Sequence, residues 1–266
     1  MRRAYAEIPE GQIHYRTAGT GPPLLLLHQS VCSSDEYTRV IPILSKDYRV
    51  IAMDTPGYGE SDKPPRPYEI PDYARSVVTF LDSLHINKTS VAGHHTGADI
   101  AVELAAMYPE RVDKLVLSGC PFSPKSSESL TPDIAKLFQP MKIEADGSHL
   151  LKVWEKAKTY SHDAPLEIYY EIALEYLKAG PRGEEAHWAS AKYDARPKLP
   201  LIKCPTLVLS GRDDVFFPVV DEIRNLVPRA RSIIIDGEGT GPAGIVRIRP
   251  EAFAEAILDF LQHPDV

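Results

Sequence analysis

The sequence predicts an α/β protein whose mostly parallel sheet is covered by helices on both faces. Short apolar runs of strand length alternate with segments whose apolar residues recur at helical spacing. The run Leu24–His28 is almost continuously apolar, which is typical of a strand buried on both faces. Strands that alternate with helices in this way indicate a parallel sheet with helical crossovers.

The predicted elements run from an amino-terminal hairpin to a closing helix. Pro9-Glu10-Gly11 supplies the turn of the hairpin. The strand pattern stops from Phe122 to Arg196, where helix formers and aromatic residues predominate. Helices are expected at Asp35–Ser45, Tyr73–Leu84, Val219–Val227 and Pro250–Leu261, and after the strand Thr89–Ala92. The other strands are expected at Ala4–Ile8, Gln12–Thr17, Leu24–His28, Tyr48–Met53, Lys114–Leu117, Thr206–Leu209 and Ser232–Ile235.

Composition limits the classes of function. With 266 residues, 43% of them hydrophobic, the chain fits one α/β domain with a modest insertion. The net charge of -7 and the lack of a Lys/Arg cluster argue against nucleic acid or an anionic membrane as partner. The start of the chain has no apolar signal segment, and the longest apolar run, Leu24–Leu27, is too short to span a bilayer. Three scattered cysteines, Cys32, Cys120 and Cys204, predict neither disulfides nor a metal site, so a cytoplasmic location is expected.

The stretch Thr89–Ala105 combines a short strand, a glycine-flanked turn and a helix. The turn reads Gly93-His94-His95-Thr96-Gly97, and apolar residues recur at helical spacing after it. A strand, a G-x-S-x-G turn and a helix form the nucleophile elbow of serine-type hydrolases, in which the glycines let strand and helix approach closely. His95 stands where this pattern has serine. The sequence thus predicts the frame of a serine hydrolase without its usual nucleophile.

Taken together, the motifs resemble those of the α/β-hydrolase fold family. They read LLLLHQ, AMDTPGYGESD, VAGHHTGA, PERVDKLVLSG and PTLVLSGRDD, and they occur in the family's order before the closing helix. The resemblance implies an eight-stranded, mostly parallel, doubly covered sheet with an inserted helical cap. Residues 1–121 and 197–266 would form the core, and residues 122–196 would form the cap.

The family's site residues carry over to this chain only in part. The nucleophile position falls on His95, and the acid after the seventh sheet strand falls on Asp214. The position of the catalytic histidine falls on Thr240. The oxyanion loop, which usually reads His-Gly, reads His28-Gln29 and continues with Ser30 as a further candidate for contact with substrate. Two of the three triad positions are therefore changed, and the acid remains.

The remaining residues favour acid–base chemistry. An imidazole titrates near neutral pH and reaches farther than a serine hydroxymethyl group, and the loss of the family histidine leaves room near the acid. We expect His95 and Asp214 to form a dyad, directly or through one water, that deprotonates a water or a substrate carbon or hydroxyl. The backbone N–H groups of Thr96 and Gln29 would form the oxyanion pocket. The alternative is that His95 fills a site that has lost its activity.

Three further side chains have two interpretations each. His94 either packs against the neighbouring loop or takes part in catalysis. His28 either supports the oxyanion loop or contacts substrate. Cys120, at the carboxyl end of a strand, is either a packing residue or a thiol nucleophile. A metal site is not expected, because the adjacent His94 and His95 point apart and no metal-binding spacing is present.

Three functions follow from this pattern. The first is a cofactor-independent enzyme that acts on a small, largely apolar carbonyl or hydroxyl compound under the cap. Its reaction would be elimination, isomerisation, cyclisation, C–C cleavage or direct attack by water. The second is an ordinary carboxylic-ester or lactone hydrolase whose nucleophile comes from elsewhere, and the third is a non-catalytic binder of small molecules. The sequence leaves the oligomeric state open.

Overall fold

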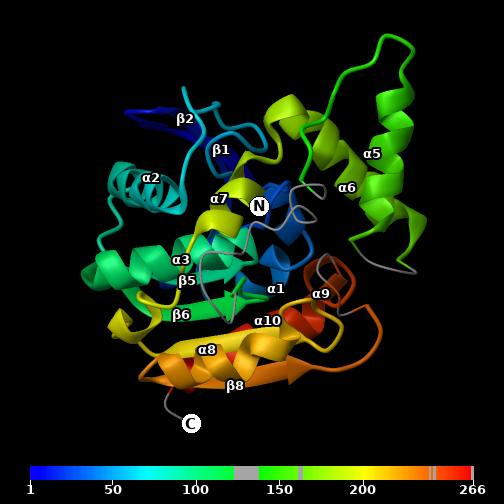
Figure 1. The fold of residues 1–266 in the computed structure, drawn as a ribbon. Coiled ribbons are helices and arrows are strands. Elements are labelled where there is room, and N and C mark those ends of the chain that lie inside the picture. The colour runs from blue at the N-terminus through cyan, green and yellow to red at the C-terminus, as the bar shows by residue number, and fades with distance from the viewer. Residues whose placement is uncertain (123–137, 161–163, 240, 242–243, 265–266) are drawn as a thin grey trace.

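A computed structural model describes the chain apart from residues 123–137, 161–163, 240, 242–243 and 265–266. Its centre is an eight-stranded sheet in the order β1-β2-β4-β3-β5-β6-β7-β8 (Figure 1). The pairings of β1 with β2 and of β2 with β4 are antiparallel, and the other pairings are parallel. The strands are β1 (Arg2–Ile8), β2 (Gly11–Ala18), β3 (Pro23–Leu27), β4 (Arg49–Met53), β5 (Thr89–His94), β6 (Val112–Ser118), β7 (Thr206–Gly211) and β8 (Ala230–Ile235).

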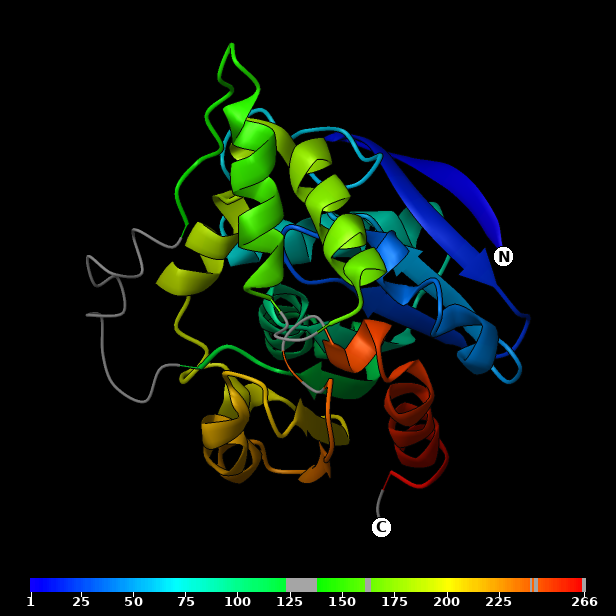
Figure 2. The ribbon, with the colours of Figure 1, turned by 90° about the vertical axis from the view of Figure 1, so that its right-hand side faces the viewer.

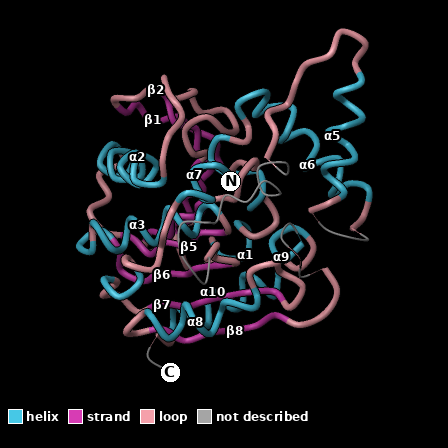
Figure 3. Tube along the Cα trace, in the orientation of Figure 1, coloured by secondary structure: helices cyan, strands magenta, loops and turns pink. Residues whose placement is uncertain are grey.

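Helices cover both faces of this sheet, as the sequence predicts (Figure 3). Side chains of α2, α3 and α8 share a core with one face, and those of α1 and α10 share a core with the other. None of the helices in the described part of the chain has the length and apolarity that a bilayer crossing requires. The covering helices are α1 (Ile41–Leu44), α2 (Ile70–Ser83), α3 (Thr96–Met107), α8 (Val220–Leu226) and α10 (Pro250–Gln262), and the short helix α9 (Gly244–Arg247) contacts α10.

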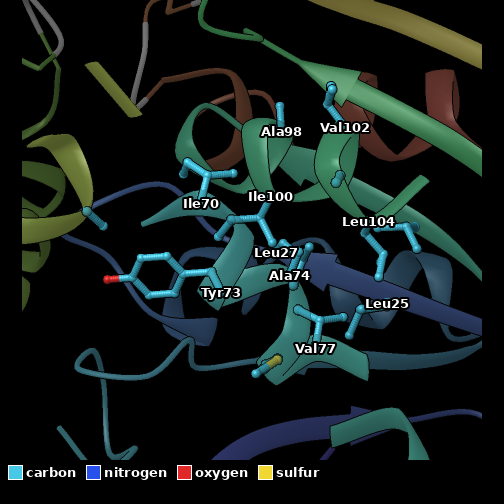
Figure 4. Close-up of a cluster of buried hydrophobic side chains, with 14 of the residues drawn as sticks. Leu25, Leu27, Ile70, Tyr73, Ala74, Val77, Ala98, Ile100, Val102 and Leu104 are labelled. Atoms are coloured by element: carbon cyan, nitrogen blue, oxygen red, sulfur yellow. The ribbon is translucent and has the colours of Figure 1, made fainter. Parts of the chain in front are cut away.

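Strand β3 shows how the alternation of side chains divides the core. Leu25 and Leu27 point to the face covered by α2 and α3, and Leu24 and Leu26 point to the opposite face. Figure 4 shows Leu25 and Leu27 among the side chains of α2 and α3. All four leucines are fully buried, and each contributes roughly 1.5–3 kcal/mol through its removal from water. The carboxyl end of β3 is therefore held firmly where the predicted oxyanion loop begins.

The eight strands expected from the sequence are all present. The prediction of one helix over Asp35–Ser45 is wrong in its extent. The structure instead has a 3₁₀ helix, η1 (Ser34–Tyr37), followed by the separate short helix α1. Pro42 explains the break. Proline has no N–H to donate to the preceding turn and its ring clashes with that turn, but it is tolerated in the first turn of a new helix.

Three helices lie between β6 and β7 in the described residues. They are α5 (Ser148–Lys158), α6 (Leu166–Ala179) and α7 (Glu185–Lys192). α5 and α6 lie side by side, far from β8 and α10 (Figures 1 and 2). The Glu171 carboxylate of α6 accepts hydrogen bonds from Arg39 and Arg247 of the core. Glu175 of the same helix accepts one from Ser33, which follows β3. These bonds fix α6 near the carboxyl end of the central strand β3.

Gly97 marks the closest approach of α3 to β3. A Cβ atom at this position would lie 2.1 Å from the carbonyl oxygen of Leu27 and 2.8 Å from that of His28. Both are backbone atoms at a buried strand end, so neither can move without disturbing the sheet. We expect Gly97→Ala to lower the free energy of unfolding by at least about 1–3 kcal/mol in urea denaturation. Gly241→Ala is the matched control, since its Cβ would meet its nearest atom at 3.8 Å. Equal stability of the two variants would contradict this account.

Candidate active site

His95 stands at the tip of a sharp turn between β5 and α3. Its backbone has a φ of 48° and a ψ of -116°, which is an uncommon conformation for a residue other than glycine. Gly93 makes the turn possible, because a Cβ atom there would lie 2.2 Å from the carbonyl oxygen of Gly97. The His95 N–H donates to the carbonyl of Ser118 at 2.9 Å and so fixes the turn to the end of β6. The chain thus presents an imidazole at the tip of a rigid strand–turn–helix.

The imidazole of His95 contacts the carboxylate of Asp214. Its Nε2 atom lies 2.8 Å from Oδ2 of Asp214. The His95 side chain is 12% exposed and that of Asp214 is 1% exposed, so solvent reaches this pair only at the imidazole. Asp214 follows β7 and His95 follows β5, so the contact spans the carboxyl ends of two strands separated by β6. The two side chains meet directly and without an intervening water.

The partners of Asp214 keep it ionised. Burial acts to raise its pKa, but the charge and the hydrogen bond of His95 act against this, as does the Phe216 N–H at 2.8 Å from Oδ1. The opposing effects prevail, so the pKa of Asp214 lies below its usual value. An ionised carboxylate only accepts hydrogen bonds, so Nε2 of His95 carries the shared proton. The basic nitrogen is then Nδ1, the reverse of the arrangement in Ser-His-Asp triads.

Two aromatic rings enclose the imidazole of His95. The ring of Phe216 meets it edge-on, with centroids 5.2 Å apart. The ring of His94 lies at a centroid distance of 4.5 Å and an interplanar angle of 58°. These contacts restrict the rotation of the imidazole and help to keep Nε2 directed at Asp214.

His94 belongs to a buried polar cluster beside the elbow. Its side chain is fully buried, with Nδ1 3.0 Å from Oγ of Ser118. Its Nε2 atom lies 4.0 Å from Oε1 of Glu36, which is also fully buried. A ring so far from solvent has no access to substrate. The structure therefore favours the packing interpretation of His94 over a direct part in catalysis.

The oxyanion loop differs from the sequence-based expectation. The N–H of Gln29, predicted to line the oxyanion pocket, donates instead to Oε2 of Glu36 at 3.1 Å. The side-chain amide of Gln29 donates to Oε1 of the same carboxylate at 2.7 Å. The Glu36 carboxylate thus accepts the hydrogen bond of the Gln29 N–H that the sequence assigned to the oxyanion pocket. The N–H of Thr96, in contrast, belongs to the first residue of α3 and has no acceptor within the helix.

His28 and Ser30 are buried on either side of Gln29. Nε2 of His28 accepts the N–H of Thr55 at 3.0 Å, and Nδ1 donates to the Gln29 carbonyl at 2.8 Å. Burial lowers the pKa of His28, so its ring is neutral and both nitrogens are engaged. This favours the interpretation of His28 as a support of the loop. Ser30 forms a hydrogen bond with the Tyr58 hydroxyl.

The other predicted candidates do not join the dyad. Cys120 is 2% exposed, and burial raises the pKa of its thiol well above the usual value. A thiol in this state is a poor nucleophile, so packing is the better interpretation. Thr240 lies outside the described residues. Within the described ranges, no three His, Cys, Asp or Glu side chains gather as ligands for a metal ion.

Sequence reasoning missed two residues of this site. Glu36 lies in a segment predicted as helix, and only the tertiary fold brings its carboxylate to Gln29. Gly119 follows β6, and a Cβ atom there would lie 2.5 Å from Cδ2 of His95. The available signal for Gly119 was its place at the end of a predicted strand next to the elbow strand. Nothing in the sequence indicated the partner of Glu36.

Comparison with known proteins places this fold in a family. Residues 22–240 match the family model described as alpha/beta hydrolase fold. The chain belongs to the alpha/beta hydrolase fold family. An enol-lactonase from Burkholderia xenovorans LB400 is similar in structure to this chain, with a TM-score of 0.82 and 24% identity. The alignment covers 98% of this chain and 100% of that chain, and at such low identity the likeness concerns the fold alone.

Curated relatives of this chain include proteins named as hydrolases. The 2-hydroxy-6-oxo-6-phenylhexa-2,4-dienoate hydrolase of Comamonas testosteroni is 30% identical over 230 residues, which cover 78% of this chain and 76% of that protein. The 2-hydroxymuconate semialdehyde hydrolase of Pseudomonas sp. (strain CF600) is 28% identical over 211 residues, which cover 76% and 74%. Three uncharacterised mycobacterial proteins are 33% identical over 135 residues, but the match spans 49% of this chain and only 38% of their length.

Because the pKa of Asp214 is lowered, the free energy of unfolding should depend on pH in the acid range. Near pH 4 the unfolded chain binds a proton at this residue more readily than the folded chain does, so stability rises with pH there. We expect the stability that ionised Asp214 provides to be complete above its unfolded pKa of about 3.9. It should be lost as the pH falls through the lower folded value. Urea denaturation between pH 6 and pH 2 should show a flatter acid limb for Asp214→Asn than for the unsubstituted protein. Asp213→Asn, at the exposed neighbouring carboxylate, is the control, and an equal flattening in both variants would argue against this role of Asp214.

Proposed function

We propose that this chain is a hydrolase in which His95 and Asp214 activate a water molecule for direct attack on a carbonyl compound. The observation that carries the proposal is the 2.8 Å contact between Nε2 of His95 and Oδ2 of Asp214. A histidine base that is oriented by a buried carboxylate is the working part of a Ser-His-Asp triad. Here that base stands at the elbow itself, in the place of the nucleophile, so water is the nucleophile that remains.

In the proposed reaction, Nδ1 of His95 takes a proton from water as the water oxygen attacks the carbonyl carbon. The N–H of Thr96, at the start of α3, stabilises the negative charge that develops on the carbonyl oxygen. The imidazolium then returns its proton to the leaving atom as the bond from that atom to the carbonyl carbon breaks. Asp214 keeps the proton on Nε2 and balances the transient positive charge of the ring. The products are a carboxylic acid and a protonated leaving group, and these steps use only groups of the chain.

The choice of hydrolysis over elimination, isomerisation or cyclisation rests on the relatives. Two of them are named as hydrolases of oxo-dienoate or semialdehyde compounds, and the matches cover about three quarters of this chain. We propose a small carbonyl compound of similar kind, such as a conjugated oxo acid, an ester or a lactone. The free cysteines Cys32, Cys120 and Cys204 support a reducing, cytoplasmic location.

The second candidate is an ordinary ester or lactone hydrolase that forms an acyl-enzyme on another side chain. The names of the relatives support this alternative better than they support the first candidate, because they specify hydrolysis and give no sign of an altered triad. Ser118 is a possible nucleophile on geometry, with Oγ 3.0 Å from Nδ1 of His94. However, Ser118 is 1% exposed, and His94 and Glu36 are fully buried. Acylation of Ser118 would therefore need the elbow to open.

Replacement of either member of the dyad tests the first candidate. We expect His95→Ala to lower turnover by roughly 10²–10⁴-fold, the usual contribution of a general base. Asp214→Asn should lower it by at least about 10-fold, because the amide fails to hold the proton on Nε2. The assay follows absorbance changes of 2-hydroxy-6-oxo-6-phenylhexa-2,4-dienoate and of chromogenic esters and lactones. His263→Ala removes an exposed histidine from the same chain and is the control. Full activity of His95→Ala would exclude the dyad, and binding without turnover by the unsubstituted protein would point to a binder.

A serine-directed phosphonate separates the two hydrolytic mechanisms. On the first candidate no residue forms an acyl-enzyme, so we expect neither inactivation nor a mass increase after incubation with the probe. Intact-protein mass spectrometry measures the adduct, and a serine hydrolase of the same fold serves as the positive control. A stoichiometric adduct that peptide mapping assigns to Ser118 or another side chain would establish the second candidate instead.

A further inference from the structure

Gly119 lies directly against the His95–Asp214 pair. A Cβ atom built on Gly119 would lie 2.5 Å from Cδ2 and 2.6 Å from Nε2 of His95. The same atom would lie 2.8 Å from Oδ2 of Asp214. Side-chain carbon atoms do not approach other heavy atoms this closely, so any residue larger than glycine would intrude into the hydrogen bond of the dyad.

The backbone of Gly119 cannot move aside to relieve such a contact. Its N–H donates to the carbonyl of Leu209 in β7 at 2.9 Å, and the carbonyl of the preceding Ser118 accepts the N–H of His95 at 2.9 Å. These two bonds continue the β5–β6–β7 ladder beyond the strand ends. The φ of Gly119 is 51°, in the left-handed region that favours glycine. Position 119 is therefore fixed in space between the elbow and the acid.

The imidazole is the group that would give way. Oδ1 of Asp214 is held by the N–H of Phe216 at 2.8 Å, so the carboxylate has little freedom. The His95 ring is bounded by the rings of Phe216 and His94, with centroids 5.2 Å and 4.5 Å away. A methyl group at position 119 would push the ring away from Oδ2, and the rings of Phe216 and His94 limit how far it can move.

We propose that Gly119 is a positioning residue, whose lack of a side chain is the condition that lets an imidazole at position 95 reach Asp214. The effect on catalysis rests on the proposed function, whereas the effect on the contact does not. The same absence of a side chain also leaves room for the Asp214 carboxylate.

Gly119→Ala is the direct test, with Gly147→Ala as its matched control. Gly147 also has a positive φ of 77°, but a Cβ atom there would meet nothing within 4 Å. The control therefore measures the cost of placing alanine in the left-handed region without a clash. We expect Gly119→Ala to lower the melting temperature more than Gly147→Ala does, and to lower turnover by roughly 10²-fold, as for a displaced catalytic group. Gly147→Ala should leave turnover unchanged.

A structural measurement keeps this test independent of activity. The ¹³C chemical shift of the Asp214 carboxyl group, followed against pH, reports whether His95 still acts on it. Loss of the contact should raise the pKa of Asp214 in Gly119→Ala. The same rise is expected in His95→Ala, and the double variant should show little more than either single variant, since both changes remove one contact. Gly147→Ala should titrate like the unsubstituted protein.

The outcomes separate the two proposals. An unchanged titration of Asp214 in Gly119→Ala would overturn the role of Gly119, whatever the activity. A changed titration in a protein whose turnover does not depend on His95 would support the role of Gly119 and contradict the proposed function. Should Gly119→Ala fail to fold, the double variant His95→Gly with Gly119→Ala empties the space of the ring. Recovery of folding in that variant would assign the clash to the imidazole. Continued failure would assign it to the Asp214 carboxylate or to the backbone, and would contradict the proposal.

Discussion

The hydrogen bond between Nε2 of His95 and Oδ2 of Asp214 is the interaction on which the site depends. A carboxylate as buried as Asp214 is costly unless a partner compensates its charge, and the imidazole is that partner. One partner follows β5 and the other follows β7, so their separation is set by the register of three adjacent parallel strands. The backbone bonds of residues 95 and 119 extend this ladder to the site itself. The sheet therefore determines the distance between base and acid.

On the proposed function, a histidine at the elbow does in one residue what a hydrolase of this family usually does in two. In the Ser-His-Asp arrangement, serine occupies the elbow and a separate imidazole joins it to the acid. Here the ring of His95 spans the whole distance to Asp214, and its two nitrogens take opposite roles. Nε2 faces the acid, so Nδ1, the nitrogen nearer the backbone, is left for the reaction.

Much of this architecture was predictable, because it is encoded locally. Continuous apolar runs such as Leu24–Leu27 indicate buried strands, and glycine spacing indicates the elbow around His95. Pro42 is a local signal for the break between η1 and α1, within a segment whose apolar residues recur at helical spacing. The partner of Glu36 was not predictable, since a buried carboxylate that binds a backbone N–H seven residues away leaves no periodic pattern. The clash at Gly119 likewise depends on three segments that only the fold brings together.

The charges around the elbow restrict the reaction that it can support. The Glu36 side chain accepts hydrogen bonds from both the backbone N–H and the side-chain amide of Gln29, so this N–H is already engaged within the protein. The start of α3 has the opposite character, because the N–H of Thr96 and the helix dipole favour negative charge. On the proposed function, stabilisation of the oxyanion therefore comes from the elbow side, through the N–H of Thr96 at the start of α3.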